Sequence, residues 1–426
     1  MDDRLTRDLA TAGERVAAGS VVPTLDFDTF RCDLGAFDFR EPRPLEDTMS
    51  WCIAQLERGV VHLTHPRYFG LFNPAPTFPS QCADRIAGAF NPQLATWTTS
   101  PVAVEIERHV IRAVAQRAGL PADAAGHFTS GGSEANYTAL LCALTRASPR
   151  FATEGARAFA GAPVFYISRE SHLAWLKIAH QAGIGRSAVR LVATDGTGRL
   201  DTRALAAVLA EDRQAGRVPV MIVATAGTTN AGMIDPLHAC AELAREAGVW
   251  YHIDAAWGGA LIVSDALRRV LVGLELADSI TLDAHKWLAT TMGAGMFMTR
   301  HGRALSAVFH VSTTFMPSEI EQVDPYVTTA QWSRRFIGLK LFLSLAAAGW
   351  AGYERHLRRS IALIEQLRAT LLEQGWTVSN RSPLAVLCVE PPNGLGAPRE
   401  IVKRVLASGR AWVAAAQLEG RDVIRI

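Results

Sequence analysis

Two charged residues stand at the ends of apolar runs that follow one another along the chain. Asp254 closes the run "VWYHIDAA", and Lys286 comes directly after His285 at the end of "ADSITLDAHK". An ionised carboxylate is costly to bury without a partner, so Asp254 implies a cationic group nearby. Lys286 could be that ion-pair partner, or both residues could serve a bound ligand.

Other polar motifs also follow apolar runs. "TSGGSEAN" places Gly132 and Ser133 at the start of a helix, where free N–H groups and the helix dipole favour an anion such as phosphate. "ATAGTTNAG" ends a strand with a threonine pair that includes Thr229, and His172 of "ESHLAW" follows the run "VFYIS". Each motif alone is more typical of a turn, a strand end or a cap than of a ligand site.

The elements around these motifs alternate in type from about residue 100 onward. The runs "APVFYIS", "AVRLVAT", "PVMIVATAG", "VWYHIDAA" and "DSITLDA" predict strands, and the amphipathic segments between them predict helices. This order indicates an α/β fold, a mostly parallel sheet with helices on both faces. Ligands of such sheets gather outside the carboxyl ends of the strands, which is where the polar motifs stand.

The sequence divides into three regions that differ in their predicted secondary structure. Residues 1–70 read as a poorly patterned helical segment, and residues 71–340 contain the predicted sheet of a large domain. A long helix begins near residue 336, and residues 341–426 predict a smaller C-terminal α/β domain.

Composition excludes several classes of function. The net charge of the 426 residues is +2 and the basic residues are scattered, so no nucleic-acid surface is expected. The six cysteines lie far apart without zinc-ligand spacing, which predicts free thiols in a reducing compartment and no metal site. The N-terminus has no apolar signal region, and no uncharged apolar run reaches the roughly 20 residues of a membrane helix. A cytoplasmic protein is expected.

The motifs together supply what a pyridoxal phosphate enzyme needs. These parts are an anion site, a group that stacks on the cofactor ring, a carboxylate for the ring nitrogen and a lysine for the Schiff base. In this interpretation, Asp254 keeps the ring nitrogen protonated and Lys286 holds the aldehyde carbon. The sequence therefore predicts pyridoxal 5'-phosphate as cofactor.

The sequence also resembles a known family, the group II amino-acid decarboxylases that use pyridoxal phosphate. This family includes aromatic-L-amino-acid, glutamate, tyrosine and diaminobutyrate decarboxylases. The motifs "FTSGGSEAN", "SRESH", "VATAGTTNAGMIDP", "HIDAAWGGA", "ADSITLDAHKW" and "QWSRRFIGLKL" carry the resemblance in the family's order. It implies a fold-type I, transferase-like enzyme that converts an L-amino acid to an amine and carbon dioxide. It also implies a homodimer with active sites at the subunit interface.

The resemblance implies four catalytic residues. Lys286 binds the cofactor covalently, Asp254 pairs with the ring nitrogen, and His172 stacks on the ring close to the substrate carboxylate. Tyr326 is the candidate proton donor, although its distance from "RRF" differs by about one residue from the aromatic enzymes. It stands on the long segment 310–331, which we expect to act as a lid.

Further cofactor contacts follow from the same resemblance. Gly132 and Ser133 hold the phosphate, Thr229 contacts the hydroxyl side of the ring, and Asp283 and His285 lie near the phosphate.

The chain departs from the family pattern at three places. Pro74 stands where the aromatic decarboxylases carry a threonine, and Ala95 replaces a bulky aromatic residue, so the substrate pocket is expected to differ in shape. The family continues for about another helix beyond Ile426, so the small domain is expected to be truncated. Three alternatives stay open: an aldehyde-forming oxidative deaminase, an aminotransferase, and an inactive binding subunit.

Overall fold

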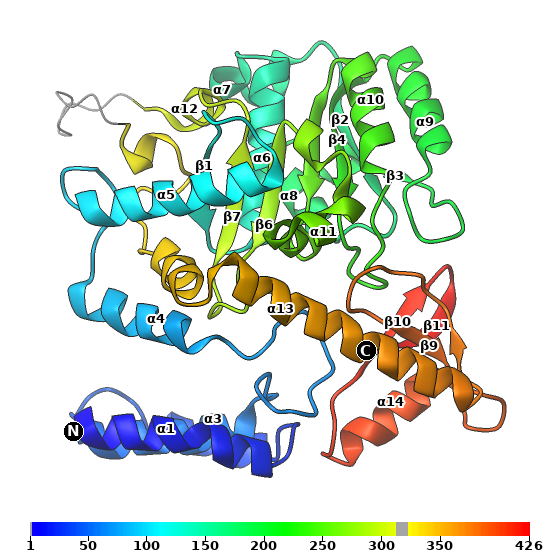
Figure 1. The fold of residues 1–426 in the computed structure, drawn as a ribbon. Coiled ribbons are helices and arrows are strands. Elements are labelled where there is room, and N and C mark those ends of the chain that lie inside the picture. Colours follow the sequence, from blue (N-terminus) through cyan, green and yellow to red (C-terminus); the bar gives the residue numbers. More distant parts are fainter. Residues whose placement is uncertain (1, 312–322) are drawn as a thin grey trace.

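A seven-stranded sheet forms the centre of the large domain (Figure 1). The computed structural model describes residues 2–311 and 323–426. The strands, in the spatial order β1-β7-β6-β5-β4-β2-β3, are β1 (Ala125–Thr129), β2 (Pro163–Ser168), β3 (Val189–Val192), β4 (Val218–Thr225), β5 (Trp250–Asp254), β6 (Ser279–Asp283) and β7 (Gly295–Thr299). β3, β2, β4, β5 and β6 pair in parallel, and β7 runs antiparallel to β6 and β1. The prediction of a mostly parallel sheet is confirmed.

Helices cover both faces of this sheet. One face packs against α6 (Gly132–Ala147), α8 (Ala174–Gln181) and α12 (Ala304–Phe309). The opposite face packs against α5 (Pro101–Ala118), α9 (Thr202–Gln214) and α10 (Leu237–Ala247). The short helices α7 (Phe151–Glu154) and α11 (Asp265–Arg268) lie in connections. The periodicity of the sequence located the longer helices of the large domain, and the structure bears this out.

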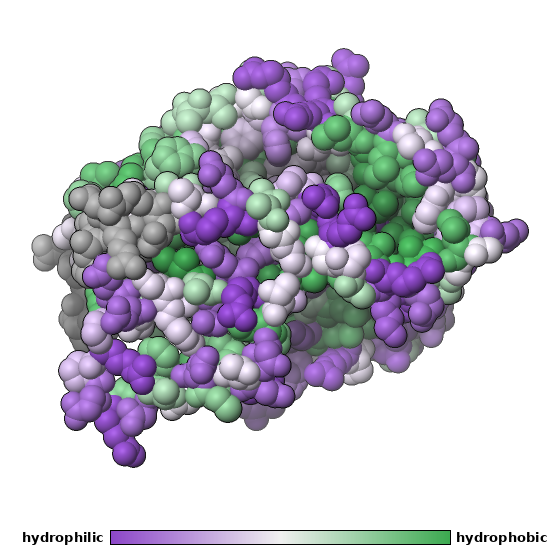
Figure 2. Space-filling model, turned by 90° about the horizontal axis from the view of Figure 1, so that it is seen from below, coloured by the Kyte–Doolittle hydropathy of each residue, from purple (hydrophilic) through white to green (hydrophobic). Residues whose placement is uncertain are grey.

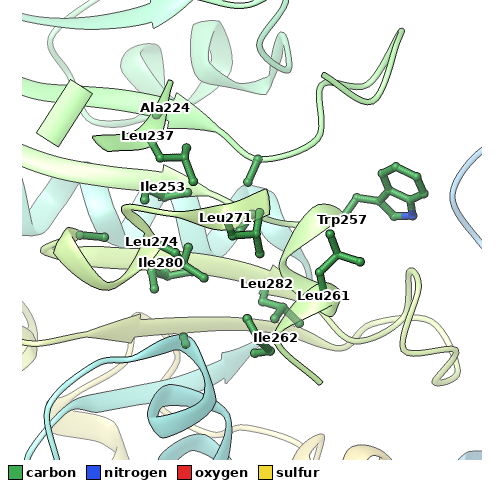
Figure 3. Close-up of a cluster of buried hydrophobic side chains, with 14 of the residues drawn as sticks. Ala224, Leu237, Ile253, Trp257, Leu261, Ile262, Leu271, Leu274, Ile280 and Leu282 are labelled. Atoms are coloured by element: carbon green, nitrogen blue, oxygen red, sulfur yellow. The ribbon is translucent and has the colours of Figure 1, made fainter. Parts of the chain in front are cut away.

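Burial on both faces explains why the central strands are continuously apolar. In β4, Ile222 and Ala224 join the cluster on one face, while Met221 and Val223 join the cluster on the other. Such alternation is the two-residue period of a strand. Figure 3 shows part of the first cluster, where Leu261 and Ile262 from the segment after β5 lie close to Leu282 of β6. This packing holds the segment after β5 against β6.

A long helix, α13 (Gly338–Glu373), leads from the large domain to the small one (Figure 1). Gly349, with φ 61° and ψ 172°, interrupts its helical geometry in a region of the φ/ψ map that suits glycine. The small domain contains an antiparallel sheet in the order β10-β11-β9-β8, with helix α14 (Pro398–Ala407) beside it. Its strands are β8 (Thr377–Val378), β9 (Cys388–Glu390), β10 (Ala414–Leu418) and β11 (Arg421–Arg425).

The N-terminal segment is helical and makes few contacts with the rest of the chain. It contains α1 (Asp2–Ala18), α2 (Phe27–Gly35) and α3 (Leu45–Gly59), and neither α2 nor α3 has a buried residue. Figure 1 shows this segment along one side of the molecule, below α4 (Phe78–Phe90). Within the described residues, no helix combines the length and apolar character that a membrane span requires.

A buried ion pair joins α5 to the segment that precedes α13. Arg334 Nη1 lies 2.6 Å from Glu107 Oε2, and both side chains are nearly inaccessible to solvent. Glu107 Oε1 accepts a second hydrogen bond from the Gly338 amide at 2.9 Å. Breaking such a pair from one side costs about 3–5 kcal/mol, because the remaining charge stays buried. The pair therefore fixes the point at which the segment from 323 to 337 rejoins the body of the domain.

Candidate active site

The predicted cofactor residues meet at one cavity of about 340 Å³ at the carboxyl ends of the parallel strands. All eight of them line it: Gly132, Ser133, His172, Thr229, Asp254, Asp283, His285 and Lys286. They come from the ends of five different strands, so motifs that are far apart in the sequence form one cavity. Tyr326 is not among the residues that line this cavity.

Asp254 is held as an acceptor at the end of β5. Its side chain is 6% exposed, and Oδ2 accepts a hydrogen bond from Asn136 Nδ2 at 2.8 Å. Oδ1 accepts from the Ala256 amide at 3.2 Å. Two donors therefore orient a carboxylate that faces the cavity, where it can accept a proton-bearing group of a ligand.

Lys286 pairs with a different carboxylate. Its Nζ lies 3.1 Å from Asp283 Oδ2, in the turn that follows β6. The alternative that Lys286 is the ion-pair partner of Asp254 is therefore wrong. The reason is local geometry, because an i,i+3 turn brings Lys286 back onto Asp283, whereas Asp254 is held by Asn136 from α6.

His285 completes the charged group at this end of the cavity. Its Nδ1 accepts a hydrogen bond from the Ala294 amide at 3.2 Å, so the neutral ring carries its proton on Nε2. That nitrogen lies 3.8 Å from Asp283 Oδ2. Burial lowers the pKa of His285, which favours the neutral form. The ring is thus a donor that faces Asp283.

The N-terminus of α6 forms the anion-binding end of the cavity. The first hydrogen bonds of the helix run from the amides of Glu134 and Ala135 to Gly131 O, so the amides of Gly132 and Ser133 precede the intrahelical pattern. Free amides and the helix dipole suit a phosphate group. A Cβ atom on Gly132 would lie 2.9 Å from Asp283 Oδ2, so the close approach of helix and carboxylate requires glycine.

Asp283 also indicates that a polar ligand belongs in this site. Its side chain is 3% exposed, and Oδ1 has no hydrogen-bond partner within the described structure. Buried polar atoms are normally paired, so a bound group or water is expected there. The free amides, the lysine, and the carboxylate of Asp254 together match the phosphate, aldehyde and ring nitrogen of pyridoxal phosphate.

His172 and Thr229 line the sides of the cavity. Nδ1 of His172 accepts from the Ala174 amide at 3.1 Å, which holds the ring after β2 and leaves the neutral ring's proton on Nε2. In the threonine pair, the buried Thr228 hydroxyl accepts from the Met233 amide at 3.0 Å, whereas Thr229 lines the cavity. One threonine therefore stabilises the turn and the other is available to a ligand.

The sequence motifs did not identify several other residues at the site. Phe72 lines the cavity, its ring 4.3 Å from that of Trp257, and the Arg425 guanidinium lies 4.3 Å from the Phe72 ring centre. Arg425 also donates from Nε to Thr229 O at 2.9 Å, so the last strand of the small domain reaches the cavity wall. Asn136 belongs to "SGGSEAN", where its place one helical turn after Gly132 was the available signal.

Tyr326 lies on the described end of the predicted lid. It belongs to the 3-10 helix Pro325–Val327, its ring stacks on Trp332 at 4.7 Å, and its amide donates to Ala95 O at 3.1 Å. Residues 312–322 of the predicted lid lie outside the described residues. The assignments of Tyr326 as proton donor and of this segment as a lid stay predictions. Pro74 and Ala95 do not line the cavity either.

Comparison with known proteins identifies the family. The sequence model of the pyridoxal-dependent decarboxylase conserved domain matches residues 38–379. The chain belongs to this family. The decarboxylase uses pyridoxal phosphate as its cofactor and acts on an amino acid, and the comparisons do not favour the aldehyde-forming, aminotransferase or inactive alternatives.

Relatives with different specificities resemble this decarboxylase. L-2,4-diaminobutyrate decarboxylase of Rhizobium meliloti (strain 1021) is 34% identical over 349 residues, which cover 80% of this chain and 68% of that protein. Aromatic-L-amino-acid decarboxylase of Bacillus atrophaeus is 30% identical over 381 residues, covering 86% and 78%. The structure of Oryza sativa TDC with PLP and tryptamine superposes with a TM-score of 0.93 at 26% identity, covering 100% of this chain and 91% of that one. The predicted fold-type I architecture is confirmed.

Replacement of Gly132 tests the anion-binding end of the cavity. In Gly132→Ala the new methyl group meets Asp283 Oδ2, so the helix start or the carboxylate must shift. We expect the affinity for pyridoxal phosphate, measured by absorbance titration, to fall by about tenfold or more, the effect of losing one charge-assisted hydrogen bond. Gly88→Ala is the control, because a Cβ there meets nothing within 4 Å. If the two variants bind pyridoxal phosphate with equal affinity, Gly132 does not contribute to cofactor binding.

Proposed function

We propose that this decarboxylase converts an L-amino acid to the corresponding amine and carbon dioxide at the cavity of Lys286. Lys286 would hold the cofactor, Asp254 would pair with its ring nitrogen, and His172 would contact its ring. The observation that supports this assignment is the convergence of these three side chains with the N-terminus of α6 on a single cavity.

The residues that line the cavity have different functions in the proposed reaction. When bound, pyridoxal phosphate supplies an electron sink for the electron pair left on the substrate as carbon dioxide departs. The amides of Gly132 and Ser133 would bind its phosphate, and Lys286 Nζ would hold its aldehyde carbon. Asp254 holds a proton at the ring nitrogen, because an adjacent carboxylate stabilises the charged form of the ring.

The side walls exclude water and orient the substrate. Phe72 and Trp257 stack on each other at 4.3 Å and form an apolar wall beside Lys286. Arg425 places a buried positive charge directly behind Phe72. Burial lowers the pKa of Arg425, and the carbonyls of Thr229 and Gly70 accept its hydrogen bonds. The apolar wall would thereby confine the substrate beside Lys286.

An assay of products tests the proposed reaction. The purified holoenzyme is incubated with a panel that includes L-2,4-diaminobutyrate, aromatic and acidic amino acids, and amine, aldehyde and carbon dioxide are quantified. We expect equimolar amine and carbon dioxide from at least one member. Asp254→Ala should lower this rate by about 10² or more, the scale of removing one preorganised electrostatic group. Aldehyde or keto acid as the main product, or an unchanged rate in the variant, would refute the proposal.

Tyr326 is our proposed donor of the proton that replaces the lost carboxylate on the substrate. Its support is its position on the described end of segment 310–331, next to the ring of Trp332. Tyr326→Phe keeps the ring and removes only the hydroxyl, so amine formation should fall by about 10² or more. Part of the product should then become aldehyde. If both the rate and the product ratio are unchanged, the proton comes from elsewhere and His172 becomes the next residue to replace.

We also propose that two copies of the chain form a homodimer through the face that carries the N-terminal segment. Large apolar side chains are exposed there, with Phe78 at 74% and Phe90 at 82% on α4, and others on the preceding helices and loop: Phe27, Leu34, Leu56 and Leu71. Figure 2 shows the molecule from the side on which the N-terminal segment lies, where hydrophobic and hydrophilic residues are interspersed. A group of large, exposed apolar side chains on one face is typical of a protein–protein interface.

Sedimentation velocity at micromolar concentration tests this assembly. We expect a dimer, and we expect the double variant Phe78→Glu, Phe90→Glu to sediment as a monomer, because a charge would be buried at the interface. Leu395→Glu is the matched control, since Leu395 is exposed on the small domain, away from α4. A monodisperse wild-type monomer with full activity would contradict the proposal.

The proposed cytoplasmic location has one structural support. All six cysteines are free, and three of them are buried: Cys142, Cys240 and Cys388. Unpaired thiols are typical of a reducing compartment.

A further inference from the structure

A chain of buried hydrogen bonds ends on Asp254. Trp250, His252 and Asp254 occupy alternate positions of β5, so their side chains point to the same face of the sheet. That face packs against α6, which contributes Asn136. Ser279 begins β6, the neighbouring strand. All five side chains are at most 6% exposed, so water does not compete for their hydrogen bonds.

The links of this chain are short and continuous. Trp250 Nε1 donates to Ser279 Oγ at 2.8 Å, and Ser279 Oγ lies 2.8 Å from His252 Nδ1. On the other side of the imidazole, His252 Nε2 lies 3.0 Å from Asn136 Oδ1. Asn136 Nδ2 then donates to Asp254 Oδ2 at 2.8 Å.

The chemistry of the groups fixes the direction of every bond. A carboxylate only accepts, so the amide nitrogen of Asn136 must face Asp254 and its oxygen must face His252. That oxygen also only accepts, so His252 carries its proton on Nε2 and Nδ1 is left as an acceptor. The Ser279 hydroxyl therefore donates to Nδ1, while it accepts from the Trp250 indole.

Two further observations agree with this arrangement. Burial lowers the pKa of His252 to about 4, so the ring is neutral at physiological pH and has one donor and one acceptor. The Thr281 hydroxyl lies 3.4 Å from His252 Nε2 and is a second, weaker acceptor for the same proton. All donors thus point toward Asp254, and hydrogen bonds in series strengthen one another.

We infer that Asn136 is a positioning residue for the cofactor, the last donor of a directed chain of hydrogen bonds that begins at Trp250 and keeps Asp254 oriented. Donation to a carboxylate favours its charged form, which is the form that can hold a proton at the ring nitrogen. Groups behind a ligand-binding residue commonly fix its orientation in this way. The inference rests on the proposed assignment of Asp254 to the ring nitrogen.

A merely structural role makes a different prediction. If Asn136 only joins α6 to β5, its loss disturbs the cavity as a whole, and any ligand of the same shape binds less well. If it acts through Asp254, its loss affects only ligands with a basic ring nitrogen. The two roles separate when pyridoxal phosphate is compared with its 1-deaza analogue, in which a C–H group replaces that nitrogen.

The experiment is a pair of absorbance titrations with Asn136→Leu, which keeps the volume and removes both polar groups. We expect the affinity for pyridoxal phosphate to fall by about tenfold to a hundredfold, and the affinity for the analogue to change by less than about threefold. Ser279→Ala interrupts the chain farther from the cavity and leaves Asn136 in place. This variant should also lower the ratio of the affinity for pyridoxal phosphate to the affinity for the analogue, but by a smaller factor.

Tyr251→Phe is the matched control for a lost buried hydrogen bond. Tyr251 lies on the same strand but points to the opposite face, where its hydroxyl donates to Leu237 O at 2.6 Å. We expect this variant to bind both ligands as the wild type does. If Asn136→Leu loses affinity for both ligands equally, or loses affinity for neither, the inference is overturned.

Asp254→Asn separates this inference from the proposed function. If that variant loses the preference for pyridoxal phosphate and Asn136→Leu keeps it, the inference fails while the assignment of Asp254 stands. If Asp254→Asn itself keeps the full preference, the assignment of Asp254 to the ring nitrogen fails as well.

Discussion

One buried carboxylate constrains the whole site. Asp254 is only 6% exposed, and an isolated carboxylate charge at that depth costs several kcal/mol even after the protein relaxes. The chain offsets this cost with donors from two directions, the Asn136 amide on α6 and the Ala256 backbone. Each donor requires its own element in place: α6 against one face of the sheet, and the sharp turn after β5. The position of a single carboxylate thus depends on most of the large domain.

The second constraint is the crowding of charges at the other end of the cavity. Lys286, His285 and the buried Asp283 lie beside the N-terminus of α6, and only a glycine at position 132 allows the helix to come so close. The small domain adds Arg425, which reaches across to Thr229 and packs on Phe72. The small domain therefore contacts two residues that line the cavity.

The sequence predicted the site better than it predicted the contacts within it. Lys286, Asp254 and His172 could be predicted to lie together, and they line one cavity, because the carboxyl ends of parallel strands share one edge of the sheet. The sequence did not decide which carboxylate pairs with Lys286. An ion pair within the turn after β6 and an ion pair with Asp254 on the neighbouring strand are compatible with the same sequence. Asn136 and Arg425 were not assigned, since their roles depend on which helix face or strand end meets the site. The strands β1 and β10 were not predicted either, because "AGHFT" and "AAAQL" lack a run of β-branched residues.

The most direct test of this account is to locate the covalent attachment of the cofactor. The holoenzyme is reduced with borohydride, digested, and mapped by mass spectrometry. The account predicts a pyridoxyl group on the peptide that contains Lys286 and loss of the visible absorption band. Lys340 provides an internal comparison, because it is buried and is engaged by Asp84 and the Met292 carbonyl. A pyridoxyl group on Lys340, Lys177 or Lys403 instead of Lys286 would contradict the account.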